Sequence, residues 1–168
     1  MARAARDAGF DVHVATRDMG YRAPILAEGF TFHALSWSKL RRKPHQIIRD
    51  ILEIRNLYKV LQPDVVHHVA LVPIIFGQLA ASGLTLASVN TIAGLGSGFI
   101  GLDPIGRLLR FGLSTALRLL LNRPSTLTVV QNPDDRQAVE RIGVASEKIR
   151  LVAGSGVDTD RLKPIPEP

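Results

Sequence analysis

The residues best suited to bind a ligand form a glycine-rich segment, VNTIAGLGSGFIGLD, at residues 89–103. Within it, Gly96, Gly98 and Gly101 match the pattern G-x-G-x-x-G. In dinucleotide-binding proteins this pattern follows the first strand of a βαβ unit and lets the backbone approach a pyrophosphate. Glycine allows such an approach because it has no Cβ. The segment could therefore bind a nucleotide or some other ligand.

The surrounding sequence argues against a dinucleotide site. The dinucleotide pattern requires an acidic residue about 20 residues beyond the glycines. Leu121 stands at that distance from Gly101, and the next acidic residue after it is Asp134. The segment also follows a late strand rather than the first one. Open α/β sheets bind ligands at the carboxyl ends of their strands, so we expect a ligand-binding loop at that edge.

Two adjacent histidines, His67 and His68, end the strand DVVHHV. Neighbouring strand residues point to opposite faces, so the pair cannot chelate one metal ion. A position at the end of a strand suits ligand binding, whereas a single histidine is usually packed or hydrogen-bonded; both interpretations stay open for one of the two. His13 and His33 lie within strands, and we interpret them as structural.

The segment 104–121 is predicted to form an amphipathic helix. Arg107, Arg110, Ser114 and Arg118 recur at spacings of three and four and form one narrow cationic stripe, while leucines cover most of the remaining circumference. Such a helix is either buried, with its arginines reaching to solvent, or lies on a membrane with the arginines at the headgroups. Both alternatives remain open from the residues.

A second helix start is predicted at QNPDDRQAV. Asn132 is a suitable N-cap, Pro133 suits the first turn, and Asp134 and Asp135 lie near the positive end of the helix. Paired acids could also serve catalysis, but capping explains them more simply.

Strand-like and helical segments alternate along the chain, which predicts an α/β fold with a Rossmann-like parallel sheet flanked by helices. The expected helices are 2–9, 45–62, 73–83, 103–121 and 133–143, and the expected strands are 11–16, 30–35, 64–69, 86–90, 126–130 and 148–153. Because the first segment is a helix, we expect that the first strand of the fold is missing. We expect one domain over residues 1–153 and a linker over 154–168.

The composition narrows the class of protein. The 168 residues carry a net charge of +6 and no cysteine, which excludes disulfides and thiolate metal sites. A basic surface favours anionic partners, including acidic lipids, phosphorylated substrates and nucleic acid. The low aromatic content, 5%, argues against stacking on single-stranded nucleic acid. We see neither a secretion signal nor a segment that would span a bilayer.

The order of these motifs resembles one known family. PDVVHHVALVP, VNTIAGLGSGF, VVQNPDD and KIRLVAGSGVDTDRLKP follow one another as in the N-terminal, acceptor-side domain of bacterial family 4 glycosyltransferases of the GT-B fold. The resemblance covers essentially the whole chain. This chain differs from the family at Val72, where lysine is common, and at Ser97, where an aromatic residue is common. The resemblance also implies that the chain is half of a GT-B fold.

The resemblance implies a set of site residues. The acceptor would contact His68, Thr91, Gly94, Leu95 and Gly96. The cleft between the two halves of the enzyme would include Asn132, Gly154, Gly156 and Asp158. Arg107, Arg110 and Arg118 would lie at the membrane surface. No catalytic residue is identified, and no metal or other cofactor is expected.

The function implied is transfer of a hexose or N-acetylhexosamine, with retention, from a nucleotide sugar to a lipid-linked or cell-surface glycan. The acceptor half would lie on the cytoplasmic face of the plasma membrane, and the donor domain would be supplied in cis or in trans. We expect the fragment alone to be inactive and to have no nucleic-acid partner. The alternative is a non-catalytic subunit that docks on the membrane and binds the acceptor.

Overall fold

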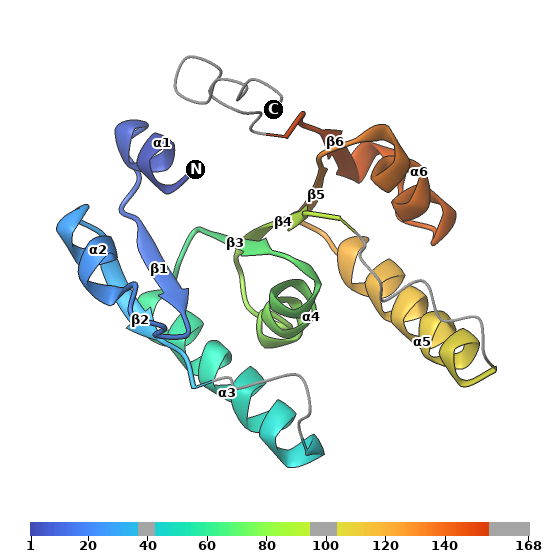
Figure 1. Ribbon diagram of the computed structural model, residues 1–168, viewed down its shortest axis with the longest axis horizontal. Helices are drawn as coiled ribbons and strands as arrows, with labels where there is room; N and C mark the ends of the chain where they lie inside the picture. The colour runs from blue at the N-terminus through green and yellow to red at the C-terminus, as the bar shows by residue number, and fades with distance from the viewer. Residues whose placement is uncertain (37–42, 95–103, 155–168) are drawn as a thin grey trace, which may run out of the picture. The chain divides into compact units, whose positions relative to one another are not determined.

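The computed structural model describes residues 1–36, 43–94 and 104–154, with the backbone alone for residues 104–110. The chain divides into two compact units, Met1–Leu61 and Gln62–Pro168 (Figure 1). Each unit has its own parallel sheet: two strands in the first unit and four in the second.

The first unit contains α1 (Ala2–Asp7), β1 (His13–Thr16), α2 (Arg22–Ala27), β2 (Thr31–Ala34) and α3 (Pro44–Leu61). β1 and β2 pair in parallel, with His13 beside Thr31 and Ala15 beside His33. The two histidine rings stack with their centroids 5.1 Å apart. Their nitrogens, Nδ1 of His13 and Nε2 of His33, lie 2.8 Å apart. These side chains therefore bind each other across the strand pair.

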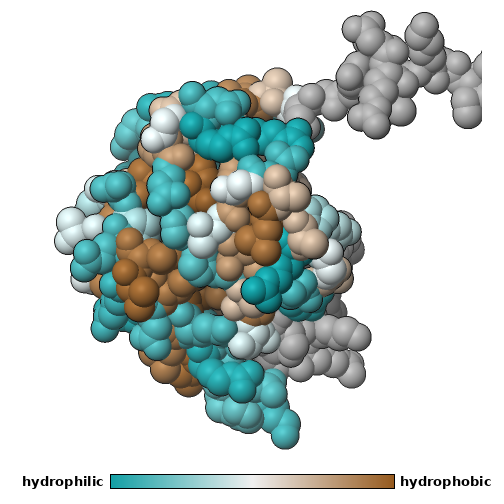
Figure 2. Space-filling view, turned by 90° about the vertical axis from the view of Figure 1, so that its left-hand side faces the viewer, coloured by the Kyte–Doolittle hydropathy of each residue, from teal (hydrophilic) through white to brown (hydrophobic). Residues whose placement is uncertain are grey.

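A side chain of helix α3 is hydrogen-bonded to the chain just after β2. Glu53 accepts hydrogen bonds from the backbone N–H of Ser36 at 3.1 Å and from its hydroxyl at 2.9 Å. The exposed hydrophobic side chains of the first unit include Met19, Leu26 and Ile48. Figure 2 shows hydrophobic residues in patches among hydrophilic ones on the face that it presents. Scattered exposure of this kind is ordinary for a folded protein and identifies no site.

The second unit contains the larger sheet. Its strands are β3 (Val65–Val69), β4 (Ala87–Ile92), β5 (Thr126–Val130) and β6 (Ile149–Leu151), in the order β3-β4-β5-β6. All three pairs are parallel. The helices between them are α4 (Leu71–Ala80), α5 (Pro104–Leu121) and α6 (Pro133–Arg141), and a short 3-10 turn, η2 (Ser146–Lys148), precedes β6.

The three helices of the second unit share one hydrophobic core with the sheet. Each helix and each of the last three strands contributes buried side chains to it: Ile74, Ile92, Leu117, Leu121, Val130, Val139, Val144 and Ile149. All of them except Val144, which lies between α6 and η2, belong to these helices and strands, so one face of the sheet is covered. Burying such side chains stabilises a fold by roughly 1.5–3 kcal/mol each.

The predicted fold class is confirmed: the chain is an α/β protein with Rossmann-like parallel sheets flanked by helices. Every predicted helix and strand is present, with shifts of a few residues at the ends. The sequence analysis missed α2, whose six residues include Pro24 and carry no side-chain cap. Proline within so short a segment lacks a backbone N–H and is typical of a turn rather than of a helix, so α2 left no helical signal.

Candidate functional site

The carboxyl edge of the four-stranded sheet brings the predicted site segments together. In the parallel register, Val69 pairs with Thr91, Ile92 with Val130, and Val130 with Leu151. The four strands therefore end at one edge. The chain leaves that edge through the start of α4, the glycine-rich segment, the start of α6 and the segment at Gly154. Ligands bind at this edge in open α/β sheets.

The junction between β3 and α4 is strained. Ala70 has φ +76° and ψ 160°, a conformation that is essentially restricted to glycine and costs about 1–3 kcal/mol in other residues. Its N–H donates to the carbonyl of Thr91 at 3.0 Å, and its carbonyl accepts from Ile74 at 3.0 Å. Both bonds hold the strained residue at the carboxyl edge. Such strain is concentrated at ligand sites, so this junction is part of the candidate site.

The first turn of α4 presents backbone N–H groups at the same edge that no side chain of the described residues caps. Ala70 is its N-cap, and no side chain caps the helix. The N–H groups of Leu71 and Val72 therefore have no partner within the helix, while Pro73 has no N–H. The positive end of a helix favours anions, so this turn is suited to a phosphate or carboxylate.

The glycine-rich segment starts at the predicted place. Gly94 is exposed and has φ +88°, a left-handed conformation that side chains rarely adopt. Leu95 and Gly96 lie outside the described residues. Thr91 is 3% exposed, and its hydroxyl lies 2.7 Å from Nε2 of His67. The pKa of His67 is lowered, mainly by burial, which favours the neutral ring.

The two adjacent histidines point to opposite faces, as predicted. His68 lies on the helix-covered face, is 6% exposed, and places Nδ1 2.8 Å from Oδ1 of Asn90. An amide oxygen only accepts hydrogen bonds, so Nδ1 carries the proton. Burial lowers the pKa of His68, partly opposed by the bond to Asn90. The other ring nitrogen faces Gly77, where an added Cβ would stand 2.2 Å away.

His68 belongs to a buried polar layer that the sequence analysis did not find. Gln78 of α4 donates from Nε2 to Oδ1 of Asn90 at 3.1 Å and to the hydroxyl of Ser88 at 2.7 Å. Ser88 lies 3.1 Å from the hydroxyl of Thr126. These polar side chains come from α4 and three adjacent strands. The signal in the sequence is the polar residue at alternate positions of ASVN and TLTVV, which alone does not show which face it occupies.

The start of α6 is capped as predicted. Oδ1 of Asn132 accepts from the N–H of Asp135 at 2.7 Å, and Nδ2 donates to the carboxylate of Asp135 at 2.8 Å. Asn132 is exposed and lies two residues after the end of β5. Capping is therefore its visible role, and its position at the carboxyl edge is compatible with the cleft role that the resemblance implies.

The remaining predicted residues fall into two groups. Gly154 is exposed and follows β6, whereas Gly156 and Asp158 lie outside the described residues. The backbone of Arg107 and Arg110 is helical, but their side chains are not described. Arg118 is exposed, and its side chain lies against the α6–η2 turn, 3.0 Å from where a Cβ at Gly143 would be.

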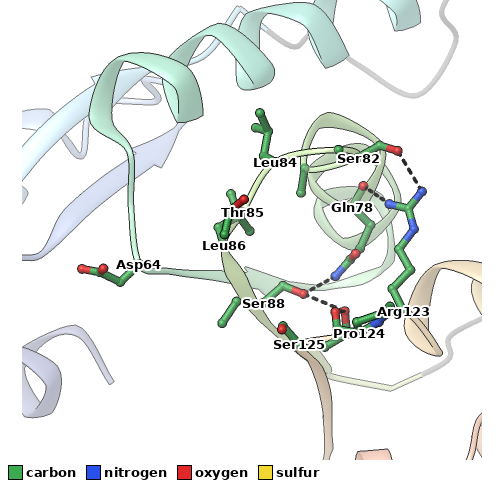
Figure 3. Close-up of a pocket in the computed structure, with 14 residues that line it drawn as sticks. Asp64, Gln78, Ser82, Leu84, Thr85, Leu86, Ser88, Arg123, Pro124 and Ser125 are labelled. Carbon is green, nitrogen blue, oxygen red and sulfur yellow. Dashed lines mark hydrogen bonds between the residues drawn. The ribbon is translucent and has the colours of Figure 1, made fainter.

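Within the described ranges, no cluster of three or more histidine, aspartate or glutamate side chains could hold a metal ion. Nor does any helix among the residues of known placement have the length and apolar character needed to cross a bilayer. A cavity of about 560 Å³ lies at the opposite, amino edge of the four-stranded sheet, and none of the predicted site residues lines it (Figure 3).

The fold and the loop-bearing carboxyl edge define the class of protein as a Rossmann-like α/β domain of the kind that forms one half of a GT-B enzyme. The family model described as "Glycosyl transferase 4-like" matches residues 1–132. The chain therefore belongs to the glycosyl transferase 4-like family, which confirms the resemblance. A search of curated proteins finds no match to its sequence.

Two solved structures share the fold. A glycosyltransferase from Rickettsia africae ESF-5 is 15% identical, with a TM-score of 0.70, over 97% of this chain and 41% of its own. The UDP-GlcNAc 2-epimerase from Methanocaldococcus jannaschii is 20% identical, with a TM-score of 0.59, over 90% of this chain and 40% of its own. At these identities the likeness shows the fold alone. The chain spans about two fifths of the length of either protein.

Proposed function

We propose that this chain is the acceptor-binding half of a glycosyltransferase. The whole enzyme would transfer a hexose or N-acetylhexosamine from a nucleotide sugar to a lipid-linked or cell-surface glycan. Membership of the glycosyl transferase 4-like family supports the reaction class. The observation that carries the acceptor role is the convergence of Ala70, Thr91, Gly94 and Asn132 at one edge of the sheet.

The chemistry of that edge suits an acceptor with a diphosphate. A lipid-linked acceptor carries a diphosphate between its lipid and its sugar, and the N–H groups of Leu71 and Val72, which have no partner within the helix, are donors for such an anion. The exposed backbone at Gly94 allows a ligand to approach closely. The hydroxyl of Thr91, held by His67, lies on the strand that leads into this loop.

The donor would be bound by the other half of the enzyme. Transfer needs stabilisation of the leaving nucleotide diphosphate as charge develops on it, and it needs the donor and the acceptor in line. This chain would provide the acceptor side of the groove and would use no metal or cofactor of its own. Retention of configuration is part of the same proposal and rests on the family alone.

The membrane would hold this half near its acceptor. The outer side of α5 exposes Phe111, Thr115, Arg118 and Leu119, whose spacings of three, four and eight residues place them on one face. Neither α4 nor α5 contains an acidic residue. A helix face that combines large apolar side chains with a cation and no anion is suited to an acidic lipid surface on the cytoplasmic side of the membrane.

A titration followed by NMR tests acceptor binding. The isotope-labelled chain is mixed with a water-soluble, short-chain prenyl-diphosphate N-acetylglucosamine, and UDP-N-acetylglucosamine is the comparison ligand. We expect the prenyl compound to shift the amide signals of Ala70, Gly94 and Asp135. The nucleotide sugar should leave them in place, because its site belongs to the other half. Equal shifts with both ligands, or none with the prenyl compound, would contradict the acceptor role.

A further inference from the structure

The amino edge of the four-stranded sheet, opposite the candidate acceptor site, contains a cavity of about 560 Å³. Its walls are the turn between α4 and β4, residues 81–87, and the segment 123–126 that enters β5; Asp64, which precedes β3, also lines it. Figure 3 shows the amide of Gln78 turned toward Ser88, and the guanidinium of Arg123, which follows α5, beside Ser82 and the carbonyl of Gln78. Ligand sites are concave and contain a few fixed polar groups, so these walls need a closer description.

The floor of the cavity is polar and rigid. Gln78, Ser88 and Thr126 line it although they are only 2%, 4% and 7% exposed. Hydrogen bonds fix all three, from Gln78 to Ser88 at 2.7 Å and between the hydroxyls of Ser88 and Thr126 at 3.1 Å. Both amide hydrogens of Gln78 are used, on Ser88 and Asn90, while its Oε1 accepts no hydrogen bond from the described residues. The floor therefore offers a preoriented acceptor.

Arg123 supplies donors on the other wall. Its Nη1 donates to the carbonyl of Gln78 at 2.6 Å, and its Nη2 donates to the hydroxyl of Ser82 at 3.2 Å. Lys148 binds the carbonyl of Arg123 at 2.6 Å and holds its backbone. A guanidinium has five N–H donors, so three remain without an acceptor among the residues of known placement. The two bonds hold the guanidinium in place on the wall of the cavity.

The charged residues that line the cavity suit a neutral ligand. Asp64 lines the cavity as well as Arg123, so the two formal charges balance. Helix α4 ends here at Ala80, and the carbonyls at a helix C-terminus disfavour an anion. Donors, acceptors and hydroxyls thus line the space, and the lining residues carry one formal charge of each sign. Five apolar side chains also line it: Ala81, Leu84, Leu86, Ala87 and Pro124.

We infer that this cavity binds one neutral sugar unit of a saccharide. A pyranose ring carries several hydroxyls that both donate and accept, which matches Arg123 and Oε1 of Gln78, and its C–H face matches the apolar residues. The site would hold a glycan away from the acceptor groove. It lies at the other edge of the sheet and does not rest on the proposed acceptor role.

The test maps saccharide binding on the 168-residue chain by amide NMR. Methyl α-glucoside and N-acetylglucosamine are the probes, and inorganic phosphate is the comparison. We expect either saccharide to shift amides in 82–88 and 123–126, with no change at Gly94 or Asp135. Phosphate should not shift the cavity amides. Saccharide shifts confined to Gly94 and Asp135, shifts with phosphate alone, or none with any probe would overturn the inference.

Substitutions then test the named groups. Arg123→Met removes the fixed donors and should weaken saccharide binding about tenfold. Arg141→Met, the same change on exposed α6 of this unit, is the matched control and should leave binding unchanged. Because Arg123 also caps α4, Thr85→Val provides a second variant that removes one lining hydroxyl without touching the cap. Full affinity in both Arg123→Met and Thr85→Val, with thermal unfolding intact, would refute the site.

Discussion

At the scale of single residues, close packing inside the second unit determines which residues are possible beside His68. His68 occupies the space that a side chain at position 77 would need, and Gln78 next to it joins His68 indirectly through Asn90. Gly77 of α4 is therefore required because the ring of His68 fills the space beside it, and not because the helix must be flexible there. Burial in the same layer lowers the pKa of His68 and favours its neutral form, so substitutions at Gly77 and His68 test the packing of the interior of the second unit.

The contact between Gly77 and His68 predicts a large effect of one methyl group. Gly77→Ala would place Cβ 2.2 Å from Nε2 of His68 and should lower the free energy of unfolding by about 1–3 kcal/mol. Gly112→Ala makes the same change in α5, where nothing lies within 4 Å, and should raise stability by up to about 1 kcal/mol. Urea unfolding measures both. Equal effects of the two substitutions would contradict this packing.

The burial of His68 predicts a pH dependence of stability. Its pKa in the folded chain lies below the ordinary value, so the unfolded chain binds more protons as the pH falls through about 6.5. The free energy of unfolding should therefore be greatest above that pH and should decline below it. In His68→Gln the decline between pH 7.5 and 5 should be smaller. An identical slope in wild type and variant would count against the buried neutral ring.

At the scale of elements, helix ends and helix faces carry the candidate functions. The first turn of α4 follows a strained residue and lacks a cap, whereas α6 starts with a full cap at Asn132. A capped end is satisfied by its own chain, and an uncapped one has donors to offer a ligand. The outer face of α5 is the third feature, because it leaves large apolar side chains in solvent.

The cap of α6 makes a prediction about stability. Asn132→Ala removes the acceptor for the N–H of Asp135 and should cost about 1 kcal/mol. Gln131→Ala, at the exposed neighbouring position, should change stability by less than about 0.5 kcal/mol. Thermal or urea unfolding of the two variants makes the comparison. A cost for Gln131→Ala as large as for Asn132→Ala would show that the cap is not the cause.

The face of α5 predicts binding to lipid. Phe111 and Leu119 are 71% and 68% exposed, and replacing both by serine should weaken sedimentation with phosphatidylglycerol vesicles at least about tenfold. Val152→Ser, at a site 55% exposed outside the helices, should have little effect. Binding should be weaker to vesicles of phosphatidylcholine alone. Unchanged sedimentation of the double variant would remove α5 from the proposed membrane surface.

At the scale of the whole molecule, the proposed function divides the reaction between an acceptor half and a donor half. The chain spans 41% and 40% of the two solved structures with its fold, and its own carboxyl edge would form one side of a groove. Catalysis of sugar transfer needs groups on both sides of the reacting bond. A non-catalytic acceptor-binding subunit and the acceptor half of an enzyme would have the same binding surface. Only a measurement of sugar transfer distinguishes the two.

Activity measurements separate these two possibilities. The purified chain, given a labelled nucleotide sugar and a lipid-linked acceptor, should transfer no sugar, because in the proposed function the groups that stabilise the leaving diphosphate belong to the donor half. Addition of a donor domain from a glycosyl transferase 4-like protein of the same source, in cis or in trans, should restore transfer if the chain is half of an enzyme. Persistent inactivity with intact acceptor binding would favour the non-catalytic subunit. Turnover by the chain alone would contradict the proposed division of labour.

The order of elements could be read from the sequence because their signals are local. The four-and-three spacing of Ile47, Ile51 and Ile54 predicted α3, and Asn132 followed by Pro133 predicted the start of α6. The carboxyl-edge position of Gly94 also followed, since parallel strands end together. Helix α2 was missed because its short segment contains Pro24 and has no side-chain cap at its start.

The sequence by itself determined the fold class, the family and the segments that meet at the carboxyl edge, because periodicity, caps and motif order are properties of neighbouring residues. Only the tertiary structure decided which histidine is buried, that Ala70 is strained, and that Gln78 and Arg123 line a cavity at the other edge. These features depend on strand register and on contacts between residues 10 to 45 positions apart. Such contacts leave no pattern in a single chain.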